Sequence, residues 1–336
     1  MRRLIVRRSL FAVVQLIGAS IIVFVLVRML PGDPATTMLG STASPEQVAA
    51  LQEHLGLDKP IPEQYLIWVG GLFSGDFGQS IVTGNPVLSD IGERLPATLE
   101  LITVTLIVVI VVLIPLGIVT ARRSRRLYAR VADKGVFTYG MLAGAAPDFW
   151  LGLMLIYVFF STLGVAPAPT GRLDLDVIPP DTITGSLIID SIVTVNWEAL
   201  RSTLSHLALP VVTLAFVYGA PILKMTRQTV IRMLDAEFVQ QARASGVSEA
   251  TILRIAFKNS LPPVITLIGV TYGFVVGGAV LVETVFSWGG LGQYAVQAIT
   301  NADFPAIQGF VLVATAISIL VYLLVDVFYP AIDPRT

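Results

Sequence analysis

Of the ionisable side chains within or at the ends of long apolar stretches, four are candidates for a functional site: Glu100, Asp148, His206 and Glu283. A charged group in hydrocarbon is costly, so such residues face a polar cavity or pair with a neighbouring group. Asp148, about halfway along its stretch, either lines a solute path or pairs with a hydroxyl or amide; Pro147 beside it favours a distorted helix. For the other three we expect either interfacial solvation with local hydrogen bonds or an outer gate for a polar solute.

The sequence contains no common motif for bond chemistry. None of its lysines follows a glycine, so it has no G-x-x-x-x-G-K-[ST] phosphate loop. It has no H-E-x-x-H zinc motif, its 2 histidines are far apart, and it has no G-x-S-x-G elbow. There is no cysteine, hence no thiol chemistry. We therefore expect a chain that is not an enzyme and has no metal, no cofactor of its own and no nucleic-acid partner.

The composition is that of a membrane protein. Apolar residues make up 54% of the chain and charged residues 13%, and the mean hydropathy is +0.79. Soluble domains carry about 25% charged residues, whereas a helix that spans a bilayer needs about 20 apolar ones. Six stretches meet that length, and the third and fifth are long enough to tilt or break: Ser9–Leu30, Thr98–Thr120, Gly135–Leu163, Leu204–Lys224, Val264–Trp288 and Ile307–Tyr329.

The basic residues predict the orientation. Of the 22 lysines and arginines, those before the first stretch, between the second and third, between the fourth and fifth, and at the end share one side of the membrane. The other side holds only Arg28, Lys59, Arg94, Arg172 and Arg201. Since basic loops stay in the cytoplasm, we expect both termini to be cytoplasmic.

Two segments are then extracytoplasmic, residues 31–97 and 164–203. In the first, Ser44-Pro-Glu-Gln47 predicts a helix start, with Gly56 as the stop. A second short helix is expected near Glu63–Phe73, with Tyr65 to Val69 at the membrane interface. The acidic segment 164–203 is either a solvated surface or a docking face for an external partner.

A polar, helix-prone segment separates the fourth and fifth stretches. It runs from Asp235 to about residue 260 and contains one expected break, at Gly246, where a positive φ would end one helix. Ser248 can cap the next helix, and the small side chains of Ala242 and Ala244 permit close approach. The segment is either a docking element for a partner or a solvated amphipathic helix.

Gly269, Gly273 and Gly277 lie four residues apart on one face of the fifth stretch. Small residues at this spacing let helices approach closely. The stripe serves either packing within the chain or contact with a sister subunit across a translocation path.

Eight motifs, in order along the chain, together resemble one family, the permease subunits of dipeptide/oligopeptide/nickel-type ABC importers, in the subtype with a long first outer loop. They are Arg2-Arg3-Leu4 with Arg28-x-x-Pro31-Gly32-Asp33-Pro34; Leu55-Gly56-Leu57-Asp58-Lys59-Pro60; Gly75-Asp76-Phe77-Gly78-Gln79-Ser80 with Pro86-Val87; Arg94-Leu95-Pro96-Ala97-Thr98-Leu99-Glu100-Leu101; His206-Leu207-x-Leu209-Pro210; Thr226-Arg227; Ala242-Arg243-Ala244-x-Gly246; and Glu283-Thr284-Val285-Phe286-Ser287-Trp288-x-Gly290-Leu291-Gly292.

The resemblance implies a sister permease in a heterodimer, two ATPase subunits or domains that hold ATP and magnesium, and an extracytoplasmic substrate-binding protein. It also implies that the polar segment docks on the ATPases through Glu237, Gln240, Gln241, Ala242, Arg243 and Gly246. The family motif reads Glu-Ala-Ala-x-x-x-Gly. Here Gln240 and Gln241 replace its first two residues, so the role of these two side chains stays open.

We therefore expect an all-α polytopic permease with six transmembrane helices and short outer helices. Its expected parts are residues 1–30, with the N-terminus and first span; the outer segment 31–97; and the core 98–336, with the coupling loop 225–261. Its expected function is half of an ATP-driven import path for peptides or related small solutes, with Glu100, Asp148, His206 and Glu283 as path or gate candidates. The alternative is an ion-coupled secondary transporter or channel acting alone.

Overall fold

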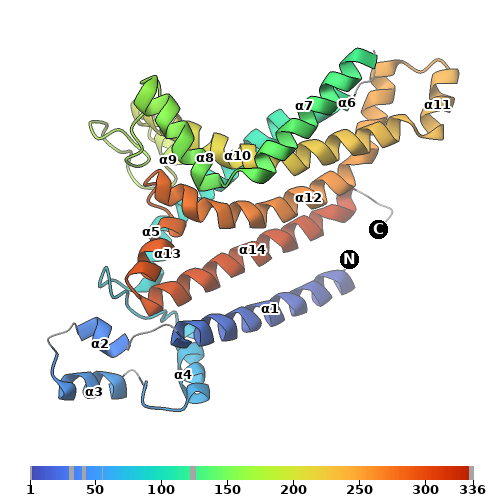
Figure 1. Cartoon of the computed structure of the whole chain (residues 1–336). Helices are drawn as coiled ribbons and strands as arrows, with labels where there is room; N and C mark the ends of the chain where they lie inside the picture. Colours follow the sequence, from blue (N-terminus) through green and yellow to red (C-terminus); the bar gives the residue numbers. More distant parts are fainter. Residues whose placement is uncertain (1, 30–33, 40–42, 55, 122–125, 333–336) are drawn as a thin grey trace. The chain divides into compact units, whose positions relative to one another are not determined.

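The computed structural model describes residues 2–29, 34–39, 43–54, 56–121 and 126–332 (Figure 1). This part of the chain is helical, with one isolated bridge between Gln79 and Pro86, so the predicted all-α class is confirmed. Some expectations fall outside it: the basic residues Arg122, Arg123, Arg125 and Arg335, the helix end at Leu55, and the motif residues Pro31, Gly32 and Asp33.

Within the described residues, five helical spans are long and apolar enough to cross a membrane. They are Arg7–Met29 within α1 (Arg2–Met29); Val87–Ala121, formed by α5 (Val87–Val108), a π-helical turn (Val109–Leu113) and α6 (Ile114–Ala121); α10 (Trp197–Leu234); α12 (Glu249–Val285); and Phe304–Leu324 within α14 (Phe304–Ile332). Several helices continue beyond the predicted stretches. Hydropathy marks only the apolar part of a helix, whereas α10 and α12 begin at polar N-caps, Asn196 and Ser248.

The sixth span is broken. Helix α7 (Arg126–Ala145) and α8 (Asp148–Leu155), which continues as a π-helical turn (Ile156–Thr162), meet at a bend of 102°. Pro147 precedes α8 with φ −60° and ψ 137°, outside the helical region. Proline has no N–H and its ring clashes with the preceding turn. The break therefore lies at Pro147, where the sequence predicts a distorted helix. By contrast, α12 stays continuous through Pro262 and Pro263.

The described chain divides into two compact units. The first comprises residues 1–98 and 289–319. Its core joins Val23 and Val27 of α1, Val87 and Ile91 of α5, Leu291, Tyr294 and Ala298 of α13 (Leu291–Thr300), and Phe304 and Ile307 of α14. Asp303, fully buried, accepts hydrogen bonds from the Ser80 hydroxyl and the Val82 amide, and so holds the loop before α5 against the start of α14.

Three short helices follow α1 in the first unit: α2 (Pro34–Leu39), α3 (Pro45–His54) and α4 (Ile61–Phe73). The predicted capping box of α3 is present, because the Ser44 hydroxyl accepts from the Gln47 amide at 3.3 Å and the Ser44 amide donates to the Gln47 side chain at 2.9 Å. Gly56 has the positive φ, 65°, expected of the stop.

Two aromatic residues of α4 that the sequence predicts at the membrane interface pack against α1. Tyr65 and Trp68 pack on Phe24 of α1, with ring centroids 5.4 Å from it in both cases, and the Tyr65 hydroxyl pairs with Ser20 at 2.8 Å. The exposed apolar side chains of this helix are instead Ile61, Leu66, Ile67 and Phe73. A continuous apolar run could not show which side faces α1.

The second unit comprises residues 99–288 and 320–336. Helix α10 is its centre, packing on α6, α7, α8, α12 and the short outer helix α9 (Leu187–Val193). One core cluster joins Val109 and Ile114 to Ala215 and Ile222 of α10 and Val264 of α12. The polar side chains discussed below are positioned mainly by α10 and its neighbours.

Candidate functional site

A short helix, α11 (Glu237–Ala244), fills the turn that joins α10 to α12 (Figure 1). Helix α10 ends at Asp235, and α11 ends before Gly246, whose φ is 77°. The Ser248 side chain then caps α12 by accepting from the Thr251 amide at 3.4 Å. The predicted break and cap are both confirmed, and the result is a helix–turn–helix directly continuous with two spans.

The faces of α11 differ in chemistry. Val239 is buried and packs inward, and Ala242 is half-buried. The remaining residues expected to dock are exposed: Glu237, Gln240, Gln241, Arg243 and Gly246. Phe238 is also exposed, at 42%. Across the turn, the Arg243 guanidinium binds the Glu249 carboxylate at 2.8 and 3.2 Å. The turn therefore presents an aromatic side chain and several polar ones on an ordered frame.

Glu100 holds the outer segment of the second unit. Its side chain is buried in α5, and one carboxylate oxygen accepts from the Ser186 hydroxyl at 2.5 Å and the Ile188 amide at 3.0 Å. The other oxygen lies 3.7 Å from the Arg172 guanidinium. This carboxylate is buried and not solvated, whereas the local hydrogen bonds that the sequence allowed for it are present.

Glu283 and Asp190 extend this acidic environment. Both side chains are buried, Glu283 completely. Burial lowers the pKa of Arg172, while Glu100, Glu283 and Asp190 oppose that shift by their charge. Burial also raises the pKa of Asp190, but hydrogen bonds from Ile183, Thr184 and Gly185 outweigh burial and hold this pKa below its ordinary value. The outer segment is thus tied to the helices by charge-assisted hydrogen bonds.

His206 makes a second connection to the outer segment. It is 5% exposed, and its Nδ1 lies 2.9 Å from the Ser202 carbonyl. Its Nε2 lies 3.7 Å from the Asp174 carboxylate, which also accepts from the Ser202 hydroxyl at 2.7 Å. All three outer candidates are therefore buried: Glu100 and His206 contact the segment 164–203, and the charge of Glu283 acts on Arg172 within it.

Asp148 stands apart from these residues, at the first turn of α8 beside the bend. Its carboxylate accepts the Tyr218 hydroxyl of α10 at 2.8 Å and the adjacent Phe149 amide at 2.7 Å. The sequence left two interpretations of Asp148, a residue that lines a solute path or one that pairs with a neighbouring hydroxyl or amide. The structure contains the pairing with a hydroxyl. The side chain stays partly exposed, so the contact does not by itself remove it from a path.

The glycine stripe of α12 is only partly a packing surface. Gly269 is buried, and a Cβ at Gly273 would overlap the Tyr322 hydroxyl of α14. A Cβ at Gly277 would have no described atom within 4 Å. The closest helix contact falls at Gly278, which the four-residue spacing missed: a Cβ there would overlap Tyr218 and lie 2.6 Å from the Asp148 carboxylate.

Sequence reasoning also missed Phe238, Arg172, Ser186 and Asp190. For Ser186 a local signal existed, since a serine before the apolar run Leu187–Val193 is a typical N-cap. The partners of Arg172 and Glu100 are 72 and more residues apart in the chain, which no local pattern reveals. The described residues include no group of three or more His, Cys, Asp or Glu that could hold a metal ion.

The membrane-spanning helices, the broken span formed by α7 and α8, and the helix–turn–helix between α10 and α12 define a multi-pass membrane protein with an ordered polar connector. The chain belongs to the family described as "Binding-protein-dependent transport system inner membrane component", which matches residues 113–336. Residues 1–102 match the corresponding N-terminal family, "Binding-prot-dependent transport system membrane comp, N-term". The chain is therefore a multi-pass inner-membrane permease subunit of an ABC importer.

Three curated relatives are similar along nearly their whole length. A probable D,D-dipeptide transport system permease protein of Escherichia coli K12 is 39% identical, over 95% of this chain and 92% of the relative. The dipeptide transport system permease protein of Alkalihalophilus pseudofirmus is 36% identical, over 98% and 97%. The di/tripeptide transport system permease protein of Pseudomonas aeruginosa is 35% identical, over 98% and 97%.

Proposed function

We propose that this chain forms half of the translocation path of an ATP-driven importer for short peptides. A sister permease would supply the other half, two ATPase subunits or domains would bind ATP and magnesium, and an extracytoplasmic protein would deliver the substrate. The peptide specificity is inferred from the relatives, whose names specify dipeptides and tripeptides.

The observation that carries the coupling proposal is the ordered turn between the two longest helices. Helix α11 connects α10, of 38 residues, to α12, of 37 residues, through a single glycine turn. Both helices span a membrane by length and composition. A partner that displaces α11 would therefore pull on two packed spans at once, which is how a nucleotide-driven closure could bias the conformation of the path.

Within α11 we assign docking to the exposed side. Phe238 is the one exposed large apolar side chain of this helix, and aromatic anchors flanked by polar groups dominate the energetics of many interfaces. Glu237, Gln240, Gln241 and Arg243 would form the polar rim, and Ala242 would permit close approach. Amides at 240 and 241 can donate and accept hydrogen bonds, so they suit this rim without a charge.

At the other end, we propose that Glu100, His206 and Glu283 act as an outer gate by holding the segment 164–203 in place at the mouth. Asp148 would act beside the bend between α7 and α8. Its hydrogen bond with Tyr218 joins α8 to α10, so a movement of α10 relative to α8 would break that hydrogen bond.

The proposed orientation has both termini in the cytoplasm and residues 31–97 and 164–203 outside. The chain has no cysteine, so single cysteines report position without ambiguity. Asp58→Cys should react with an impermeant thiol reagent in intact cells, whereas Ala250→Cys in the first turn of α12 should react only after permeabilisation. The reverse labelling pattern would mean that the chain has the opposite orientation in the membrane.

Substrate identity is tested by uptake in a strain that lacks this chain and other peptide importers. Restoring the chain should restore accumulation of labelled dipeptides and tripeptides, with unlabelled peptides competing and free amino acids not competing. Restored accumulation of chelated nickel, with no peptide uptake, would reject the peptide assignment and leave the importer assignment standing.

A further inference from the structure

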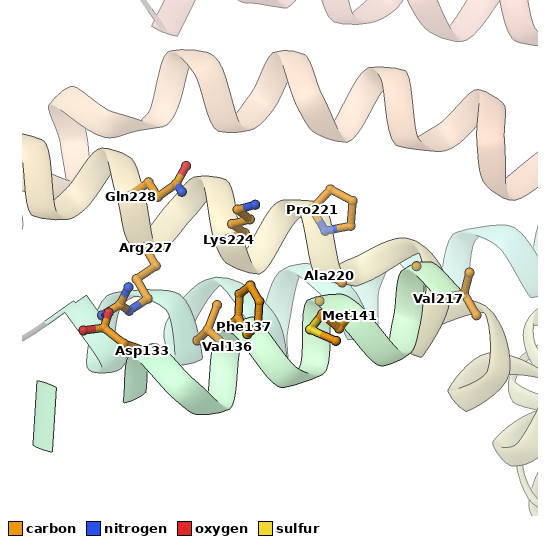
Figure 2. Close-up of a pocket in the computed structure, with 12 residues that line it drawn as sticks. Asp133, Val136, Phe137, Met141, Val217, Ala220, Pro221, Lys224, Arg227 and Gln228 are labelled. Carbon is orange, nitrogen blue, oxygen red and sulfur yellow. The ribbon is translucent and has the colours of Figure 1, made fainter. Parts of the chain in front are cut away.

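A groove lies between α7 and α10, away from the coupling turn and from the buried acids. Its volume is about 540 Å³, within the range of about 300–1,000 Å³ typical of small-molecule sites. Figure 2 shows Phe137 and Met141 of α7 between the two helices, and Arg227 of α10 reaching across to Asp133. Both helices belong to membrane-spanning segments, so the groove borders lipid or another subunit.

One wall of the groove is apolar and open. Phe137 is 67% exposed and Met141 is 59% exposed. Between and beside them, Gly140 and Gly144 have no side chain, and a Cβ at either position would have no described atom within 4 Å. The result is a slot, lined by hydrocarbon and running along α7, with the shape and polarity to take an alkyl chain.

The other end of the groove is cationic. Arg227 and Asp133 lie 2.5 Å apart and neutralise each other. Lys224, one turn earlier on α10, is exposed and has no hydrogen-bond or ion-pair partner among the described residues, and exposed Gln228 lies one turn further on. The groove thus carries one uncompensated positive charge next to amide donors and a hydrocarbon slot.

We propose that this groove binds one anionic phospholipid, with its phosphate at Lys224 and Gln228 and an acyl chain along Phe137 and Met141. An amphiphile satisfies both ends at once, whereas a free anion would leave the slot unfilled. Basic pockets between membrane helices on the cytoplasmic side bind anionic headgroups for the same reason. The site concerns this chain alone and depends on neither the proposed substrate nor the coupling turn.

The test measures lipid binding to the full-length chain, purified with any accompanying subunits, by native mass spectrometry during titration with phosphatidylglycerol or phosphatidylcholine. Wild type should prefer phosphatidylglycerol. Lys224→Gln should reduce that preference about fivefold, the effect of one cation near an anionic headgroup. Lys258→Gln, which removes an exposed lysine of α12 outside the groove, is the matched control and should change nothing.

Gly140→Leu provides a second, independent variant, because it fills the slot and keeps Lys224. It should reduce retention of both lipids while leaving the remaining preference for phosphatidylglycerol. Equal binding of the two lipids by wild type, or equal effects of Lys224→Gln and Lys258→Gln, would overturn the proposal. So would loss of a second permease chain from Gly140→Leu with lipid binding unchanged, since the groove would then be a protein interface.

Discussion

At the scale of single residues, two buried acids are matched by hydrogen-bond donors, distant in the sequence for Glu100 and nearby for Asp190. Glu100 accepts from Ser186 and Ile188, and Asp190 accepts from three consecutive residues at 183–185. A buried carboxylate is tolerable only when such donors replace water. The segment 164–203 is consequently an ordered part of the second unit. Removing either acid would remove hydrogen bonds that hold this segment in place.

Removing one anchor should loosen this segment. Glu100→Ala leaves the Ser186 hydroxyl and the Ile188 amide without their acceptor and removes the negative charge 3.7 Å from the Arg172 guanidinium. Breaking a buried pair from one side costs about 3–5 kcal/mol. We expect a lower thermal midpoint and faster proteolysis between residues 164 and 203. Glu198→Ala, at an exposed acid of the same region, is the control and should match wild type. Equal stability of the two variants would contradict the anchoring role.

Neighbouring glycines of α12 give a sharper comparison. Gly278→Ala would place a methyl group against Tyr218 and Asp148, and overpacking of this kind costs about 1–3 kcal/mol. Gly277→Ala meets no described atom within 4 Å and should be neutral or stabilising, by up to about 1 kcal/mol, because alanine favours helix. Thermal unfolding of the two variants in detergent measures the difference. If Gly277→Ala were the more damaging, the assigned face of α12 would be wrong.

Some of the residues that make these contacts could be selected from the sequence, but their partners could not. Sequence reasoning selected Asp148 and left two interpretations open; the choice depends on Tyr218, 70 positions away. It selected Gly273 from a four-residue spacing but not Gly278, because the contact there is set by a tyrosine on another helix. Local patterns identify unusual residues, whereas partners depend on tertiary packing.

At the scale of elements, local chemistry predicted more. Pro147 gave the break between α7 and α8, Ser44 and Gln47 gave the start of α3, and Gly246 with Ser248 gave the turn after α11. These signals act within a few residues, so they can be read from the chain. The full lengths of α10 and α12 could not be read in this way, since their polar ends are held by packing and caps.

The turn after α11 favours glycine at position 246 because of its backbone conformation, not because a side chain would lack room there. A Cβ at Gly246 would have no described atom within 4 Å, but the residue has φ 77°. Valine there should cost about 1–3 kcal/mol in local strain, misplace α11, and reduce both ATPase copurification and peptide uptake. Asparagine adopts positive φ far more readily, so Gly246→Asn should retain most of both. Gly246→Val should still insert in the membrane, because the spans are packed elsewhere.

Two controls separate strain from bulk. Ala250→Val adds the same kind of side chain in the exposed first turn of α12, without a positive φ, and should behave as wild type. Lys59→Ala changes an exposed outer residue and should leave ATPase association intact. If Val and Asn at position 246 assembled and transported equally well, the turn would be a solvated connector with no coupling role.

At the scale of the whole molecule, two units with separate cores share one chain. The family match has a similar division, with residues 1–102 and 113–336 matched separately. Residues 289–319 nevertheless belong to the first unit, because α13 and the start of α14 pack with α1 and α5. The sequence analysis, based on hydropathy, expected a core of residues 98–336 that includes this region, and that division stays a prediction.

The central claim is that this chain transports peptides only when ATPase partners drive it. The direct measurement is uptake of a labelled dipeptide into proteoliposomes that hold the chain with its partner subunits, with ATP inside and the binding protein outside. Uptake should require internal ATP, continue in the presence of a protonophore, and be absent when the chain is reconstituted alone. Uptake by the lone chain without ATP, or uptake abolished by the protonophore while ATP is present, would contradict it.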